Sequence, residues 1–264
     1  PDFEGTTLQL STRGLMEINA STPRLPWHSL VSGNYAKMLD LDYVNAYTPV
    51  GHRAFSKLLC MSFEGSTCDE AYASLFTVDP YTQATFADLM RLDRVVLQRE
   101  QYPHIDETPP PPGWHWVEPP PVAKGEIVVL ERDGGPVSTA PGRVSATVGV
   151  DVRPISSTVD HERLEVTSPT GGSVVFARLA WPGYTATLDG NPLQTKGLGD
   201  MFLYVDIPPG THAAELDIHF DPPGWQLGLA GMGFGLLVLL VLMALHYRSK
   251  FRRHPPERVY TPAL

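Results

Sequence analysis

The feature that most constrains this chain is an apolar segment near its C-terminal end, residues 227–245, LGLAGMGFGLLVLLVLMAL. These nineteen residues include no charged and no strongly polar side chain. At about 1.5 Å per residue a helix of this length measures roughly 28 Å, close to the bilayer hydrocarbon thickness of about 30 Å. The segment therefore predicts a transmembrane helix. The alternative is a buried core helix, but a core helix this long usually carries a polar face.

The flanking residues predict how the helix is oriented. Trp225 and Tyr247 stand where amphipathic rings prefer the headgroup level, so the predicted span covers residues 224–247. Four basic residues follow at once, namely Arg248, Lys250, Arg252 and Arg253. By the positive-inside rule, residues 248–264 form a basic cytoplasmic tail and most of the chain lies outside the cytoplasm.

The first twenty residues, PDFEGTTLQLSTRGLMEINA, lack the basic region and apolar run of a signal peptide. Export of a large soluble part requires such a signal or an upstream membrane segment. We therefore expect a longer protein, in which upstream membrane helices precede this chain. A mature chain separated from its signal sequence is the alternative.

Composition agrees with a folded extracytoplasmic part and one anchor. Hydrophobic residues make up 42% of the chain and charged residues 19%, which is enough apolar surface for a packed core. The net charge is −9, but residues 247–264 carry five basic residues against one acidic residue, so residues 1–246 carry −13. Such an acidic part argues against nucleic acid as a partner. The bilayer itself is the first predicted partner.

The chain has two cysteines, Cys60 and Cys68, both in the part predicted to lie outside the cytoplasm. They enclose seven residues that include Gly65 and Ser66, which suit a turn. In an oxidising compartment this spacing favours a disulfide. A metal site is the weaker alternative, because no histidine or further cysteine lies nearby at ligand spacing.

Residues 1–108 are predicted to form a mixed α/β unit. Residues 7–10 and 94–98 have strand character, and residues 84–92 repeat apolar side chains with a helical period. The stretch 43–55, YVNAYTPVGHRAF, is a turn-rich loop dense in aromatic and hydrogen-bonding groups. Such a loop either faces a ligand or connects buried elements.

Proline runs mark residues 109–122 as a stiff linker or an edge segment between two domains. The runs bracket Trp114 and Trp116, whose rings could stack on a sugar. The alternative is that the two tryptophans pin the linker to the neighbouring β domain.

Residues 123–222 change to short strands separated by Gly, Pro, Asp and Asn, which predicts an antiparallel β-sandwich. The seven predicted strands are residues 127–132, 143–150, 163–168, 173–181, 185–190, 201–207 and 211–220. Asp189 and Gly190 predict a tight hairpin turn, and Pro208 to Gly210 predict the next turn. The fold class predicted for the whole chain is α+β with one C-terminal transmembrane helix.

The last fifty residues of this β region, followed directly by a membrane helix, resemble the C-terminal end of the bacterial YfhO family and related GT-C-type glycosyltransferases. The shared features are an apolar strand, a Pro-Gly-Tyr turn, an Asp-Gly hairpin, a Pro-x-Gly-x-His-type turn and a strand that ends in an aromatic residue. The matching residues here are Trp181, Pro182, Gly183, Tyr184, Asp189, Gly190, Pro209, Gly210, His212 and Phe220. The match covers under a third of the chain and identifies architecture more than chemistry.

The resemblance implies a many-spanning bacterial plasma-membrane enzyme that transfers a sugar from a polyprenyl-phosphate carrier to a cell-envelope acceptor. In such enzymes the catalytic acidic residue usually sits in the first extracytoplasmic loop near the N-terminus, which this chain does not include. Asp40 and Asp42 form a D-x-D triplet, the metal-binding pattern of another glycosyltransferase class. Alternation in a strand produces such a triplet easily by chance.

No catalytic residue, metal ligand or cofactor is predicted, because no nucleophile, metal or phosphate-loop motif is present in the sequence. Gly231 and Gly235 form a G-x-x-x-G that allows close packing against other membrane helices. Two functions remain open. One is a non-catalytic module that helps a GT-C-like enzyme bind its acceptor glycan, with Trp114, Trp116, Trp181 and Tyr184 as candidate sugar-stacking residues. The other is a membrane-anchored binding or scaffold protein without enzymatic activity.

Overall fold

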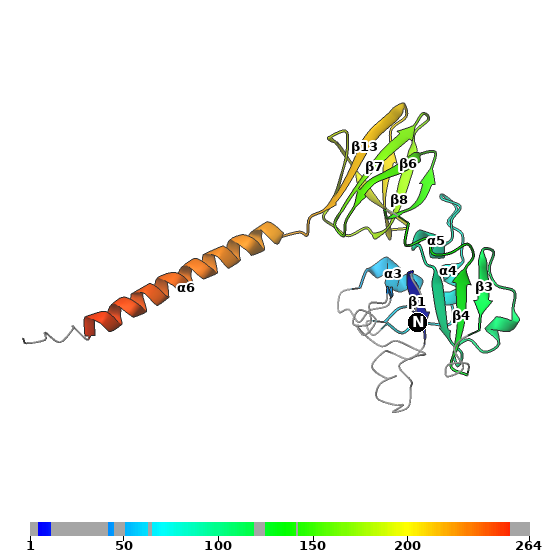
Figure 1. Cartoon of the computed structure of the whole chain (residues 1–264), viewed down its shortest axis with the longest axis horizontal. Coiled ribbons are helices and arrows are strands. Elements are labelled where there is room, and N and C mark those ends of the chain that lie inside the picture. The colour runs from blue at the N-terminus through cyan, green and yellow to red at the C-terminus, as the bar shows by residue number, and fades with distance from the viewer. Residues whose placement is uncertain are drawn as a thin grey trace, which may run out of the picture. The chain divides into compact units, whose positions relative to one another are not determined.

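In the computed structural model, the chain divides into two compact units, Pro1–Phe220 and Asp221–Leu264. The residues that the structure describes are 5–11, 42–44, 51–62, 65–118, 125–140 and 142–253, with side chains to residue 248. The first unit contains three sheets and the second contains one long helix (Figure 1). The α+β class and the C-terminal apolar helix are therefore confirmed.

The first sheet has four strands in the order β1-β2-β4-β3. These strands are β1 (Thr7–Leu10), β2 (Arg94–Gln98), β4 (Ile127–Arg132) and β3 (Trp114–Val117). β1 pairs with β2 in parallel, and the other two pairs are antiparallel. The side chains of β1 and most of those of β2 are buried. This burial of both faces agrees with the continuous apolar run Val95 to Leu97 in β2, whereas β1 alternates Leu8 and Leu10 with the buried polar residues Thr7 and Gln9.

Short helices accompany this sheet. They are α3 (Arg53–Leu58), α4 (Ala71–Leu75), α5 (Phe86–Leu89) and the 3-10 turn η1 (Ile105–Glu107). α5 begins with a capping box, in which Thr85 and Asp88 each accept a hydrogen bond from the other's backbone N–H. The helix predicted at residues 84–92 is thus present, but it is shorter, because Arg91 already adopts a positive φ of 54°.

Strand β4 corrects the predicted boundary of the sandwich. The sequence places residues 127–132 in the sandwich, but this strand pairs with β2 and β3 in the first sheet. The Pro-rich segment is accordingly not a simple linker, because Trp114–Val117 forms β3, which pairs with β4 at the edge of the described sheet. Prolines can flank such an edge strand without removing a ladder hydrogen bond. Pro119 to Pro121 lie outside the described residues.

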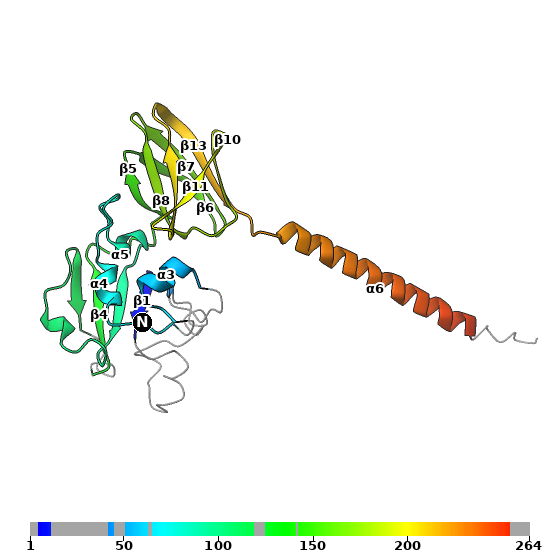
Figure 2. The same cartoon turned by 180° about the vertical axis from the view of Figure 1, so that it is seen from behind.

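The predicted antiparallel β-sandwich is present, with two sheets and nine strands. One sheet has the order β10-β9-β13-β7-β6 and the other β11-β12-β8-β5. Figure 2 labels β13, β7 and β6 of the first sheet and β11, β8 and β5 of the second. The strands are β5 (Val144–Val148), β6 (Asp151–Ser157), β7 (His161–Ser168), β8 (Gly172–Leu179), β9 (Tyr184–Leu188), β10 (Asn191–Leu193), β11 (Thr195–Leu198), β12 (Phe202–Ile207) and β13 (Thr211–Phe220). All pairs within these sheets are antiparallel.

Alternation along β13 explains how its sheet covers the core. Leu216 and Ile218 are buried in the core between the sheets, while Glu215 and Asp217 remain partly exposed. β9 is the neighbour of β13 in the same sheet. A tight turn at Asp189 and Gly190, whose φ angles are 48° and 78°, connects β9 to β10. This is the predicted hairpin turn, since a two-residue loop of this type needs a positive φ at both positions.

The α/β part and the sandwich pack against each other within the first unit. Phe202 and Val175 of the sandwich belong to the same buried cluster as the residues of α5. The ring of Phe86 on α5 lies 6.3 Å from the ring of Phe202. In addition, the hydroxyl of Tyr81 donates to Oγ of Ser173 at 3.0 Å. These contacts hold the end of α5 beside strands β5 and β8.

The second unit is dominated by α6 (Trp225–Arg253). Its stretch Trp225–Arg248 is 24 residues long, and an 18-residue window within it has a mean hydropathy of 2.4, with none of that window buried within the protein. Length and composition are sufficient for this helix to span a membrane, which agrees with the predicted anchor. A side chain added at Gly231 or Gly235 would meet no other atom within 4 Å, so these positions lie open.

Candidate functional site

The four aromatic residues predicted to stack on sugars lie in two separate sets of elements. Trp114 and Trp116 belong to β3 in the first sheet, whereas Trp181 and Tyr184 stand beside and within β9 of the sandwich. Trp114 is only 4% exposed, and its ring meets Phe76 edge-on at 5.5 Å, with the guanidinium of Arg132 4.6 Å from its centre. In this structure the ring of Trp114 contributes to packing.

The other three aromatic residues are half-buried and have neighbours of their own. Trp116 stacks on Tyr72 at 6.5 Å and donates from Nε1 to the carbonyl of Thr108 at 2.9 Å. Trp181 meets the ring of His52 at 5.0 Å, and Tyr184 lies 4.7 Å from Phe220. The four rings therefore do not form one platform, and their carbohydrate role stays a prediction.

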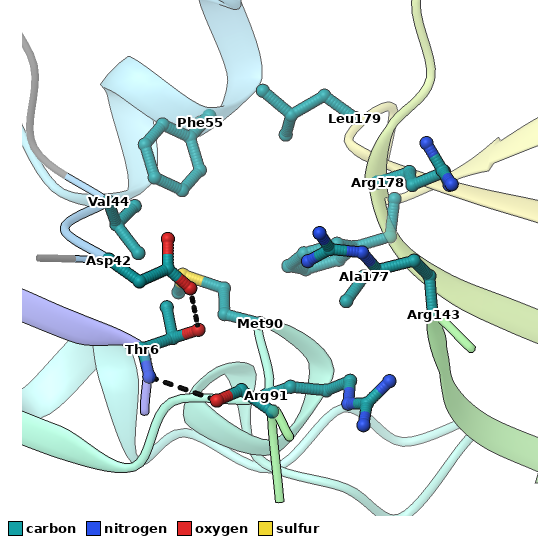
Figure 3. A pocket seen from close by; sticks show the side chains of 12 residues that line it. Thr6, Asp42, Val44, Phe55, Met90, Arg91, Arg143, Ala177, Arg178 and Leu179 are labelled. Carbon is teal, nitrogen blue, oxygen red and sulfur yellow. Dashed lines mark hydrogen bonds between the residues drawn. The ribbon is translucent and has the colours of Figure 1, made fainter. Parts of the chain in front are cut away.

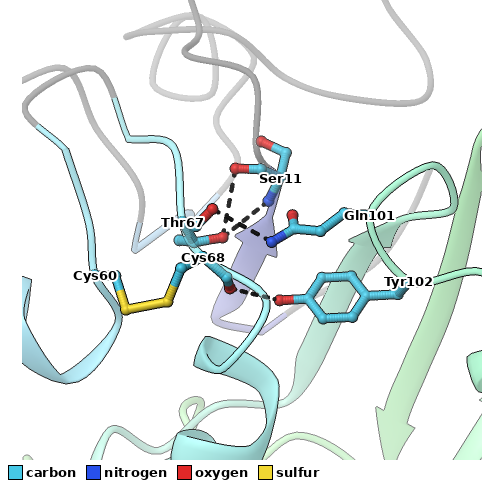
Figure 4. The surroundings of a disulfide bond; sticks show 6 residues. All are labelled: Ser11, Cys60, Thr67, Cys68, Gln101 and Tyr102. Carbon is cyan, nitrogen blue, oxygen red and sulfur yellow. Dashed lines mark hydrogen bonds between the residues drawn. A yellow bond between two sulfur atoms is a disulfide. The ribbon is translucent and has the colours of Figure 1, made fainter.

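The two cysteines form the predicted disulfide (Figure 4). The Tyr102 hydroxyl donates to the carbonyl oxygen of Cys68 at 3.0 Å, and the Thr67 N–H donates to the carbonyl of Ser11 at 2.7 Å. The disulfide thus closes the segment after α3 into a loop, and the hydrogen bond between Thr67 and Ser11 joins this loop to the end of β1. Glu70 lies close to both sulfur atoms, but bonded sulfurs offer no thiolate to a metal ion.

A cavity of about 260 Å³ lies where the α/β part meets the sandwich (Figure 3). Its residues come from the position just before β1, from the segment around Asp42, from α3, from the end of α5, and from β8 and its neighbours in the sandwich. The lining residues are Thr6, Asp42, Val44, Phe55, Met90, Arg91, Ser138, Arg143, Ala177, Arg178, Leu179 and Phe202. We take this cavity as the candidate functional site.

Two of the three arginines at the cavity are held by the protein itself. The guanidinium of Arg91 donates to the carbonyl oxygens of Val137, Ala140 and Gly142, and the residue is only 7% exposed. Burial lowers the pKa of Arg91, and the nearby positive charge of Arg143 lowers it further. The hydrogen bonds of Arg91 therefore mainly connect the end of α5 to the segment that leads into β5.

Arg178 is fixed in a similar way from β8. It donates to the carbonyl oxygens of Thr158 and Val159, and its Nη2 lies 3.6 Å from Oε2 of Glu162. Glu162 is buried and also accepts the backbone N–H of Arg143 through Oε1 at 2.5 Å. One buried carboxylate therefore balances the charge of Arg178 and positions the start of β5.

Arg143 differs from the other two arginines. The residue is exposed, and its guanidinium makes no hydrogen bond or ion pair with any other residue that the structure describes. Figure 3 shows its side chain extending into the cavity from the sandwich side, with Asp42 on the opposite side. Arg143 is thus the cation at this cavity that is available to a ligand.

The opposite wall offers oxygen atoms. Thr6 donates from Oγ1 to Oδ2 of Asp42 at 2.6 Å, and its backbone N–H donates to Oγ of Ser138 at 3.0 Å. Asp93, just behind this wall, is buried and accepts backbone N–H groups of Thr6 and Val137. Asp42 is therefore the exposed carboxylate of the cavity, whereas Asp93 serves to hold the wall together.

Apolar side chains complete the lining. Val44, Phe55, Met90, Leu179 and Phe202 bring carbon surface to the cavity from both parts of the unit. Among the described residues that line it there is neither a histidine nor a cysteine. A free guanidinium, a carboxylate, hydroxyl groups and apolar surface together suit the binding of a small polar molecule.

The sequence predicts only some of the residues that line the cavity. Asp42 is the second member of the D-x-D triplet, while Asp40 lies outside the described residues. Val44 and Phe55 belong to the predicted ligand-facing or connecting loop, of which residues 45–50 also lie outside. The arginines of the cavity were not predicted, because no local motif links positions 91, 143 and 178.

Comparison with protein-family models, with curated proteins and with solved structures finds no match to this chain. The fold and the cavity therefore define the chain only as an α+β unit with a β-sandwich, joined to an apolar helix. The resemblance to the YfhO family and GT-C-type enzymes stays a prediction from the sequence motifs.

Proposed function

We propose that this chain is the non-catalytic, extracytoplasmic C-terminal module of a membrane-embedded GT-C-like glycosyltransferase, where it helps to bind the acceptor glycan. The observation that carries the proposal is the cavity between the α/β part and the sandwich, which combines polar and apolar groups as saccharide sites do. An apolar helix of spanning length follows the sandwich directly. This arrangement suits a binding module kept next to a membrane.

The orientation proposed for the module puts the disulfide-bonded unit outside the bacterial plasma membrane and the C-terminal tail in the cytoplasm. The basic residues that follow Tyr247 support it through the positive-inside rule. The disulfide between Cys60 and Cys68 supports it as well, because such bonds persist in oxidising compartments.

The second candidate function is a membrane-anchored scaffold of the cell envelope without enzymatic activity. The same observations support it, except for the family resemblance. The two proposals differ in what precedes the chain in its gene. A hydropathy scan upstream of Pro1 separates them. About a dozen further membrane spans favour the glycosyltransferase module, and a single signal peptide favours the scaffold.

The binding proposal is tested with the full chain, purified with its disulfide intact and inserted in lipid nanodiscs. Incubated on an array of bacterial envelope polysaccharides, it should bind a subset of acceptor glycans above the level of empty nanodiscs. The Trp181→Ala variant tests the predicted stacking role and should reduce that binding. A folded sample that binds no glycan would overturn acceptor recognition.

A further inference from the structure

We propose that the cavity binds one acidic sugar unit, with the sugar carboxylate on Arg143 and sugar hydroxyl groups on Asp42 and Ser138. The inference rests on the proposed glycan-binding function and names the class of ligand for it. It follows from how charge and hydrogen-bonding capacity are distributed around the cavity.

The three arginines at the cavity differ in the donors that they leave for a ligand. Arg91 and Arg178 already donate to five backbone carbonyl oxygens, and Arg178 faces the buried carboxylate of Glu162. Of the three arginines that line the cavity, Arg143 alone makes no hydrogen bond to another described residue through its five N–H donors. A guanidinium presents these donors in a fixed plane that matches a carboxylate with two parallel hydrogen bonds.

Asp42 and Ser138 give the opposite wall of the cavity both hydrogen-bond acceptors and a donor. Oδ2 of Asp42 accepts from Thr6, and no described residue donates to its Oδ1. The Ser138 hydroxyl accepts from the N–H of Thr6 and keeps its own proton for a ligand oxygen. A carboxylate next to a hydroxyl can accept from one sugar hydroxyl and donate to another. This wall therefore favours a ligand that carries hydroxyl groups.

A compact anion suits this cavity poorly. Inorganic phosphate would bring negative charge close to Asp42, and like charges at short range repel. A hexuronate avoids this conflict, because its carboxylate and its hydroxyl groups lie on different carbons of the ring. Its C–H faces can also pack on the apolar side chains of Phe55, Met90 and Leu179.

The size of the cavity fits a single sugar ring. Its volume of about 260 Å³ lies just below the roughly 300–1,000 Å³ of pockets for drug-sized ligands. One monosaccharide unit, at the end of a glycan or as a branch, is therefore the expected occupant.

The test measures binding of sodium glucuronate, glucose and inorganic phosphate to the full chain in nanodiscs by isothermal titration calorimetry. Glucuronate should bind at least about tenfold more tightly than glucose or phosphate. Arg143→Gln should remove this preference for glucuronate over glucose. The matched control is Arg153→Gln, an exposed arginine on β6 that does not line the cavity, and it should change nothing.

Asp42→Asn tests the other wall. Removal of its negative charge should improve phosphate binding relative to glucuronate, while an intact fold is verified by circular dichroism. Equal binding of phosphate and glucuronate to the unmodified chain would overturn the assignment, and so would an unchanged affinity for glucuronate in Arg143→Gln.

The result also separates this inference from the proposed function. Binding to neutral envelope glycans without any affinity for glucuronate would leave the glycan-binding function in place and overturn the acidic-sugar site. Glucuronate binding that depends on Arg143, without binding to any envelope glycan, would support the site and count against acceptor recognition.

Discussion

At the scale of single residues, Glu162 is a buried charged group whose removal should be costly. It is 1% exposed, it accepts the N–H of Arg143, and it lies 3.6 Å from Arg178, whose side chain is only 10% exposed. Glu162→Ala leaves the largely buried guanidinium of Arg178 without its carboxylate partner, so the free energy of unfolding should fall by about 3–5 kcal/mol. Chemical denaturation of the chain in micelles, followed by tryptophan fluorescence, measures this loss.

The control for this prediction lies on the same strand. Glu165 on β7 is 3.7 Å from Arg153, whose side chain is 85% exposed. Because surface ion pairs contribute little, Glu165→Ala should lower stability by less than about 1 kcal/mol. Similar losses in the two variants would contradict the structural role assigned to Glu162.

Asp88 predicts a dependence of stability on pH. Burial alone would raise its pKa, but hydrogen bonds from Thr85 and Arg132 outweigh burial and bring the pKa below its ordinary value of 3.8. A lowered pKa in the folded state means that this stabilisation is complete above the unfolded pKa and is lost as the pH falls through the folded one. Thermal unfolding between pH 6 and about pH 2 should therefore show a smaller acid-induced decrease in Asp88→Asn than in the unmodified chain. An identical decrease in both proteins would contradict this contribution.

At the scale of elements, the hairpin between β9 and β10 gives a clear prediction. Gly190 has a φ of 78°, and a Cβ added there would meet no atom within 4 Å. Gly190→Ala should therefore destabilise the unit through backbone strain alone, by about 1 kcal/mol. Gly125 also has open space around it but no left-handed φ, so Gly125→Ala is the matched control and should change the unfolding midpoint little. A larger midpoint shift in the Gly125 variant would reverse this conclusion.

The elements that the sequence predicted well are those whose signals are local. β1, β2 and β13 match their predicted ranges, because apolar patterning within each strand reflects its own burial. β6 was missed because it is an edge strand that contains Pro154 and is mostly exposed, so it shows no apolar alternation. β4 was predicted as a strand but assigned to the wrong sheet, since a strand's pattern indicates which faces are buried and not which strand is its neighbour.

At the scale of the whole molecule, the candidate site could not be read from the sequence. Its cavity forms only where the end of α5 meets β5 and β8, which bring together arginines at positions 91, 143 and 178. Their different roles depend on partners far away in the chain, such as Glu162 for Arg178. The predicted aromatic residues were recognisable as a type, but burial of Trp114 follows from tertiary packing that no local pattern encodes.

At the same scale, the predicted membrane anchor can be tested directly. Residues 227–245 include eleven Leu, Phe and Val residues, which together favour insertion by about 3–7 kcal/mol, whereas each arginine at the helix centre costs about 2.5–3.5 kcal/mol. Two central arginines, in Leu236→Arg with Leu240→Arg, should therefore offset the whole gain.

The measurement is alkaline extraction of membranes from bacteria that produce the chain behind a cleavable export signal. The unmodified chain should stay in the membrane pellet, and the double arginine variant should move largely to the soluble fraction. Alanine at the same two positions removes only about 1 kcal/mol and should leave the chain in the membrane. If the arginine variant stays in the pellet as completely as the alanine variant, insertion of α6 is not what holds this protein to the membrane. The two variants differ by several kcal/mol in the expected insertion free energy, so insertion of α6 would make their extraction differ.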